Sequence, residues 1–256
     1  MKTSIPAVGV LGAAVNSHGA VILTAMTAQQ YTSVDFGKTY NVSPLYGISQ
    51  STSFFGEDNK DIGIVGTFIQ GRGNDVSGVA VSSNNGTTFD VYAAGVDYPR
   101  YGAFPSAKTW FVSAGIWPES ASAAADKNSR RFNSRMNVHK SGAVFSDVHT
   151  NSGDNGWFAS VAKTSDGGAT FKEVLRSPDN STYYFNAISC SSETHCVVVG
   201  EGDDSNAKSG SQTVAFTTTN GGDTWVQTLQ TDDYSLIGKR LLTITIILPF
   251  ASIVAL

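Results

Sequence analysis

The fold of this 256-residue chain is decided by the stretch Thr218-Thr219-Asn220-Gly221-Gly222-Asp223-Thr224-Trp225. It predicts two strands joined by a tight turn, because apolar residues lead into it and out of it. The two glycines can adopt the positive φ values that such a turn needs. The short Asn220 side chain can hydrogen-bond the backbone N–H groups of its own turn. Trp225 then begins the outgoing strand with a large apolar side chain.

The same spacing occurs three more times, and we call each match a box. A box begins with Ser or Thr. Asp or Asn, then Gly, then Thr follow at intervals of two residues, and an aromatic residue comes directly after the Thr. Four matches to a five-point pattern are a strong signal of an internal repeat. The boxes are Ser33-Asp35-Gly37-Thr39-Tyr40, Ser82-Asn84-Gly86-Thr88-Phe89, Thr164-Asp166-Gly168-Thr170-Phe171 and Thr218-Asn220-Gly222-Thr224-Trp225.

The box pattern resembles the Asp-box (BNR) repeat, S-x-D-x-G-x-T-[WF], of sialidase-type β-propellers and their sortilin-like and photosystem II stability factor-like relatives. The resemblance covers roughly residues 20–235, and two of the four boxes carry Asn in place of Asp. It implies a structural role for the box, whose polar residue satisfies the turn while its aromatic residue packs between blades. It specifies the fold better than the function.

The box spacing predicts an all-β propeller of four-stranded antiparallel blades, with each box in the turn between the third and fourth strands. The boxes start at residues 33, 82, 164 and 218, so their spacings are 49, 82 and 54 residues. The longer middle spacing indicates an insertion at about residues 118–156. Four blades are visible, which fits a small propeller, a partial or truncated one, or one whose further blades lack boxes.

Composition agrees with this fold and excludes one class of partner. The chain has 26 Gly, 14 Phe and 9 Tyr but only 15% charged residues, as expected for many strands and turns. Its net charge of −4 gives no basic surface for nucleic acid.

The two ends differ from the propeller region, which we place at residues 18–235. Residues 1–17 are a candidate signal peptide; the alternative makes residues 8–15 the first strand. Residues 236–256 form an atypical apolar tail, uncharged from residue 241 onward. That tail fits a membrane or GPI anchor, a buried closing strand, or an aberrant end of the repeat. Membrane association is expected only in the first case.

The only two cysteines, Cys190 and Cys196, flank a predicted turn between adjacent strands. A hairpin disulfide is favoured over buried thiols, and over a metal site that would use His195, because a fourth ligand is missing. We assign no metal and no cofactor. A disulfide places the domain in an oxidising compartment. Sequons at Asn41, Asn85 and Asn180 are compatible with a secreted or lumenal glycoprotein.

The functional face is expected opposite the boxes. In an up-and-down blade with strands A to D, the A–B and C–D turns share one face, while the B–C and D–A connections share the other. The unusual residues of this chain fall on the second set of connections, where a rigid scaffold displays variable loops. The candidate ligand-binding residues are Arg72, Arg100, Tyr101, Trp117, Arg176, Tyr183 and Tyr184.

Two functions compete for this face. Sialidases bind their substrate with three arginines and use a tyrosine nucleophile with a glutamate, plus an aspartate acid/base. Arg72, Arg100 and Arg176 could supply the arginines, and the weak catalytic candidates are Asp97, Tyr98, Arg100 and Glu119. However, the Arg-Ile-Pro element that precedes the first box in sialidases is absent, so no catalytic residue is assigned. For a xyloglucanase-like enzyme, the only supporting residue is Trp117. We therefore expect a non-catalytic propeller that binds a protein or a carbohydrate, with a glycoside hydrolase as the alternative.

Overall fold

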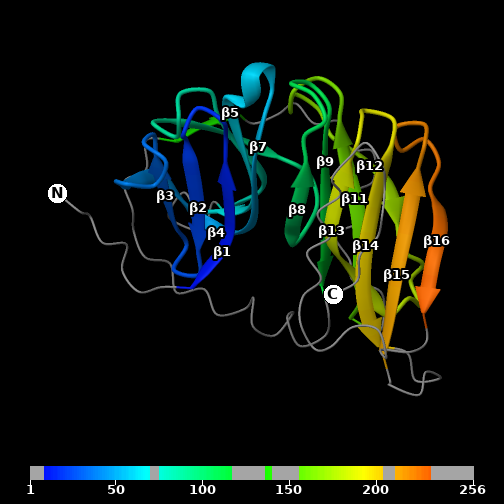
Figure 1. The fold of residues 1–256 in the computed structure, drawn as a ribbon. Coiled ribbons are helices and arrows are strands. Elements are labelled where there is room, and N and C mark those ends of the chain that lie inside the picture. Colours follow the sequence, from blue (N-terminus) through cyan, green and yellow to red (C-terminus); the bar gives the residue numbers. More distant parts are fainter. Residues whose placement is uncertain (1–8, 70–74, 117–135, 140–155, 204–210, 232–256) are drawn as a thin grey trace.

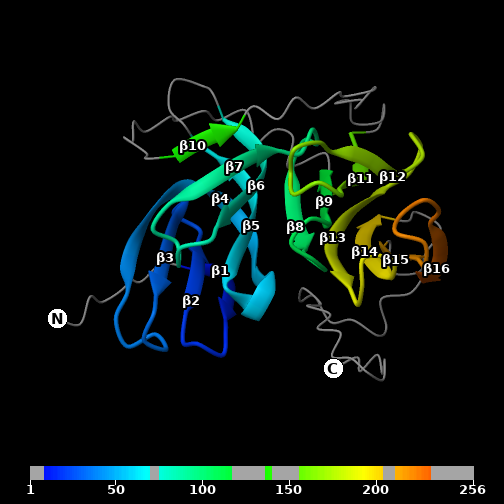
Figure 2. The same cartoon turned by 90° about the horizontal axis from the view of Figure 1, so that it is seen from above.

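The computed structural model describes residues 9–69, 75–116, 136–139, 156–203 and 211–231. These residues form a β-propeller of four-stranded antiparallel blades, as the box spacing predicts. We number the blades one to four in chain order. Figure 2 shows them side by side, with blade one at one end and blade four at the other. The one helical turn in the described residues is the 3-10 turn η1 at Glu57–Asn59.

The first two blades share a strand. Blade one consists of β1 (Val10–Val15), β2 (Val21–Ala25), β3 (Gln29–Ser33) and the first part of β4 (Asn41–Phe55). Blade two consists of the second part of β4, β5 (Asp61–Phe68), β6 (Val76–Ser82) and β7 (Phe89–Ala93). Because β4 pairs with β3 up to Tyr46 and with β5 from Gly47, blade one passes into blade two without a loop. Residues 10–15 are thus a paired strand, and the candidate signal peptide at residues 1–17 stays a prediction.

The last two blades are separate sheets. Blade three consists of β8 (Pro99–Ala103), β9 (Trp110–Ile116), β11 (Phe158–Thr164) and β12 (Lys172–Arg176). Blade four consists of β13 (Tyr183–Cys190), β14 (Cys196–Asp203), β15 (Ser211–Thr218) and β16 (Val226–Thr231). Within the range of the insertion predicted at about residues 118–156, β10 (Met136–His139) pairs in parallel with β7. Residues 232–256 lie outside the described residues.

All four box turns use one set of hydrogen bonds. In the first box, the Ser33 hydroxyl donates to Asp35 Oδ1 at 2.7 Å and accepts the Gly37 N–H at 3.0 Å. The same Oδ1 accepts the Thr39 N–H at 2.9 Å. The boxes with Asn keep these three bonds. A fourth bond, between the Asp or Asn side chain and the hydroxyl of the box Thr, reverses its direction. The Thr39 hydroxyl donates to Asp35 Oδ2, whereas Asn84 Nδ2 donates to the Thr88 hydroxyl. Asn therefore replaces Asp without loss of a hydrogen bond.

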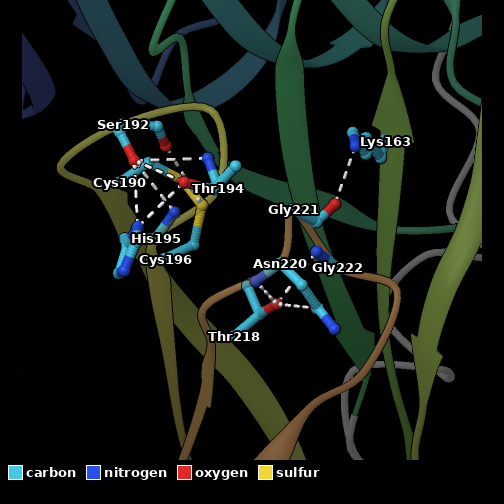
Figure 3. The surroundings of a disulfide bond; sticks show 10 residues. All are labelled: Lys163, Cys190, Ser192, Thr194, His195, Cys196, Thr218, Asn220, Gly221 and Gly222. Carbon is cyan, nitrogen blue, oxygen red and sulfur yellow. Dashed lines mark hydrogen bonds between the residues drawn. A yellow bond between two sulfur atoms is a disulfide. The ribbon is translucent and has the colours of Figure 1, made fainter.

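The residue before the box glycine ties each of three box turns to the A–B turn of the same blade. The backbone N–H of Phe36, Gly167 and Gly221 donates to the carbonyl of Gly19, Lys108 and Thr194, respectively. In blade four, Lys163 of blade three also donates to the Gly221 carbonyl at 2.7 Å, as Figure 3 shows. All three positions have positive φ, which is unusual for an aromatic residue such as Phe36 at φ 59°.

The hydrophobic core lies between the blades and has three parts. Ile22, Leu45 and Ile64 belong to the part between blades one and two. Val65 and Trp110 belong to the next part, and Phe111 and Phe185 to the last. The box aromatics of blades two, three and four, Phe89, Phe171 and Trp225, each pack in the part shared with the preceding blade.

Adjacent glycines in the third box allow a matched test of this packing. A Cβ on Gly168 would lie 2.7 Å from atoms of both Trp110 and Tyr92, whereas a Cβ on Gly167 has its nearest neighbour at 3.8 Å. Both residues have positive φ, at 91° and 72°. We expect Gly167→Ala to lower the free energy of unfolding by about 1 kcal/mol through backbone strain, and Gly168→Ala by about 2–4 kcal/mol. Urea denaturation of both variants measures this, and equal losses would contradict the inter-blade contact.

The first box predicts a pH dependence of stability. Hydrogen bonds from the hydroxyl and backbone of Thr39 lower the pKa of Asp35 from 3.8 to about 2. A carboxylate whose pKa is lowered on folding stabilises the fold above its unfolded pKa, and this contribution is lost as pH falls toward 2. We expect Asp35→Asn to remain folded, as the second and fourth boxes do with Asn, and to lose less stability between pH 5 and pH 2.5. Urea midpoints across this range provide the measurement, and parallel curves for the two proteins would argue against it.

Candidate functional site

Four of the predicted site residues that the structure describes lie at the end of the blades opposite the boxes. The box turns lie with the A–B turns, and Figure 1 shows η1 and the β15–β16 turn at the same end of the molecule. Strands β8 and β13 therefore start at the other end, where Arg100, Tyr101, Tyr183 and Tyr184 lie.

The best-defined polar group at this end is a cross-strand network of blade four. Tyr184 on β13 pairs with Glu201 on β14. The Tyr184 hydroxyl donates to Glu201 Oε1 at 2.5 Å, and Asn186 Nδ2 donates to the same oxygen at 2.7 Å. Neither Glu201 nor Asn186 is among the candidates selected from the sequence, and both lie within strands rather than loops.

Two side chains of blade three contact this network at the Tyr184 ring. The guanidinium carbon of Arg100 lies 4.8 Å from the centre of the Tyr184 ring, a cation–π contact. The ring of Trp157 stacks on Tyr184 at 6.3 Å between centroids. Gly115 makes this approach possible, because a Cβ there would lie 2.7 Å from Tyr184 Cβ. We call Arg100, Trp157, Tyr184, Asn186 and Glu201 the rim cluster.

Burial dominates the electrostatics of the rim cluster. It raises the pKa of Tyr184 well above its ordinary value, and the hydrogen bond to Glu201 raises it further. Burial also raises the pKa of Tyr101, against the opposing charge of Arg100, and lowers the pKa of Arg100 itself. The pKa of Asp97 is raised for the same reason. The tyrosine hydroxyls therefore remain protonated at neutral pH.

The other predicted residues are not all brought together. Arg176 pairs with Glu173 at 3.3 Å and lies over the Phe158 ring at 4.8 Å. Tyr183 is buried in the core between blades three and four. Tyr98 is 39% exposed on the connection into β8, with φ 53°. Arg72, Trp117 and Glu119 lie outside the described residues.

A shallow pocket lies on the other face, between the third and fourth boxes. Its volume is about 320 Å³, and Lys163, Asp166, Lys172 and Asp223 contribute to its lining. Asp166 accepts hydrogen bonds within its own box, and Lys163 donates to Gly221. Two of its four charged groups thus already stabilise turns.

The disulfide between Cys190 and Cys196 is present and closes the A–B hairpin of blade four. Figure 3 shows it beside the fourth box, with His195 Nδ1 2.8 Å from the Thr194 hydroxyl. Among the described residues, no cluster of three or more His, Cys, Asp or Glu side chains could hold a metal ion. The disulfide indicates an oxidising, non-cytosolic compartment. None of the helical segments in the described ranges is long and apolar enough to cross a membrane.

Comparison with known proteins gives similarity to solved structures alone. No protein-family model and no curated protein matches the chain. The GH74 xyloglucanase from Xanthomonas campestris is similar at 13% identity and a TM-score of 0.49, over 87% of this chain and 30% of the enzyme. YCF48 bound to D1 peptide gives 10% identity and a TM-score of 0.39, over 87% and 82% of the two chains. A fructofuranosidase from Schwanniomyces occidentalis gives 13% identity and a TM-score of 0.41, over 88% of this chain and 47% of the enzyme. The chain thus spans less than half the length of either enzyme.

Proposed function

We propose that this propeller is a non-catalytic binding module, secreted or lumenal, that holds a protein or glycan ligand on the face opposite the boxes. The observation that carries the proposal is the internal pairing of that face. Glu201 accepts two hydrogen bonds from neighbouring side chains, and Arg100 lies over the Tyr184 ring. Side chains that hold one another in place in this way suit recognition, because little side-chain entropy is lost on binding.

The arginines argue against a sialidase-type site. That chemistry needs three guanidinium groups directed at one carboxylate of the substrate. Arg176 is instead paired with Glu173 on its own strand, and Arg100 is stacked on an aromatic ring. Burial and the hydrogen bond to Glu201 also raise the pKa of Tyr184, so its phenolate is less populated at neutral pH than that of an ordinary tyrosine.

One observation favours the glycoside hydrolase alternative. The Tyr184 hydroxyl donates to Glu201 at 2.5 Å, and a tyrosine nucleophile assisted by a glutamate uses the same pair of groups. We rank this function second because Asn186 shares the Glu201 oxygen, which weakens that carboxylate as a base.

An exposed aromatic on each face allows a matched test of the binding face. Tyr98 and Phe36 are 39% and 66% exposed, and both have positive φ. Tyrosine is frequent among side chains that anchor interfaces. We expect Tyr98→Ala to weaken ligand binding at least about tenfold with little change in melting temperature, and Phe36→Ala to leave binding unchanged. A glycan array and cross-linking to extracellular proteins of the native host identify the ligand, and titration then compares the variants. Loss of binding in Phe36→Ala alone would place the ligand on the box face.

A fluorogenic sialoside assay separates the two functions. We expect no turnover by the wild-type chain, since its described arginines have other partners. Tyr184→Phe and Glu201→Gln are the control variants. Turnover that both variants abolish, in proteins with unchanged circular dichroism, would make the hydrolase the correct function.

A further inference from the structure

The contact between successive blades follows one rule throughout the described chain. The box glycine of each later blade packs on the blade before it. A Cβ on Gly86 would meet Thr32 of blade one, one on Gly168 would meet Tyr92 of blade two, and one on Gly222 would meet Val174 of blade three. In the first box, the three atoms nearest to a Cβ on Gly37 all belong to the side chain of Tyr40 from the same box. The face of blade one that corresponds to the packed faces of the later blades is therefore left at the surface.

That face of blade one is apolar. Ala14 and Ile22 point toward blade two, so the alternating residues of the same strands point the other way. Val15 and Leu11 on β1 are 64% and 37% exposed, and Val42 on β4 is 66% exposed. The row Ala13, Leu23, Tyr31 and Val42 crosses the whole blade in register and contains no charged side chain, and within it Tyr31 is 7% exposed. A sheet face of this kind is normally covered.

The free face of blade four is also apolar. Val198 and Phe216 pack toward blade three, so Val199 and Ala215 point away from it. In register, Ala187, Val199, Ala215 and Leu229 form a row across the blade, in which Ala215 is 7% exposed and Leu229 is 44% exposed. This row is the counterpart of the faces of blades one to three on which the next blade packs.

We propose that the partner of both faces is a second copy of this chain. Blade four of each copy packs on blade one of the other, so the contact that already occurs between consecutive blades is repeated twice. Two such head-to-tail interfaces are related by a two-fold axis and close a ring of eight blades. Eight blades lie within the usual range for propellers. The inference is independent of the ligand that the rim binds.

The oligomeric state of the full chain tests this proposal. Light scattering after size-exclusion chromatography is expected to give twice the chain mass of 27.0 kDa. Val15→Glu on blade one and Leu229→Glu on blade four each place a charge in both interfaces, and each is expected to weaken the dimer at least about tenfold. Ile48→Glu on blade two, an equally exposed apolar position at 57%, is the control and should leave the dimer intact. Circular dichroism checks that each variant is folded.

Mixing the two variants gives the decisive result. In a head-to-tail pair of Val15→Glu and Leu229→Glu chains, one interface joins the two altered faces and the other joins two unaltered faces. An equimolar mixture is therefore expected to regain dimer that neither variant forms alone at the same concentration. A wild-type monomer overturns the proposal, as does a dimer that Leu229→Glu leaves intact, since that dimer would join blade one to blade one.

Discussion

One side-chain oxygen in each box carries the constraint on which the propeller depends. Asp35 Oδ1, and the matching oxygen in the other boxes, accepts both the Ser or Thr hydroxyl and the backbone N–H of the box Thr. A tight turn leaves these donors without ladder partners, and the side-chain oxygen provides an acceptor for both of them in one turn conformation. Because the turn then has one conformation, the box glycine and the aromatic residue are presented to the preceding blade in the same way each time.

This constraint separates the two faces of the molecule. At the box end, the polar side chains are used within the turns, and three box turns are tied to the A–B turns by backbone hydrogen bonds. At the opposite end, side-chain contacts join blade three to blade four. Side chains at such a rim can change without loss of the blade, which is why ligand recognition is better placed there.

The rim cluster depends on a register change that lies far from the boxes. The disulfide pairs Cys190 with Cys196, and continuing that register would place Tyr184 opposite Gly202. A shift in register between Phe185 and Ala187 places it opposite Glu201 instead. Bulges of this kind redirect side chains and are common near functional sites. Without the shift, neither the Tyr184 hydroxyl nor Asn186 would be positioned to share the Glu201 carboxylate.

The sequence by itself determined the all-β fold, the blade repeat, the box turns and the disulfide hairpin. The box turns and the disulfide hairpin depend on residues within about ten positions of one another, so their hydrogen bonds and φ preferences can be inferred from local spacing. The all-β fold and the blade repeat follow from the recurrence of that local pattern along the chain. Only the tertiary structure decided that Glu201 and Asn186 join Tyr184, that Arg176 pairs with Glu173, and that Met136–His139 adds a strand to blade two. These contacts depend on the β-bulge in blade four, on local strand register and on which blades are neighbours. The physical reason is that a bulge or an inter-blade contact is selected by the packing of many distant residues, which no local spacing encodes.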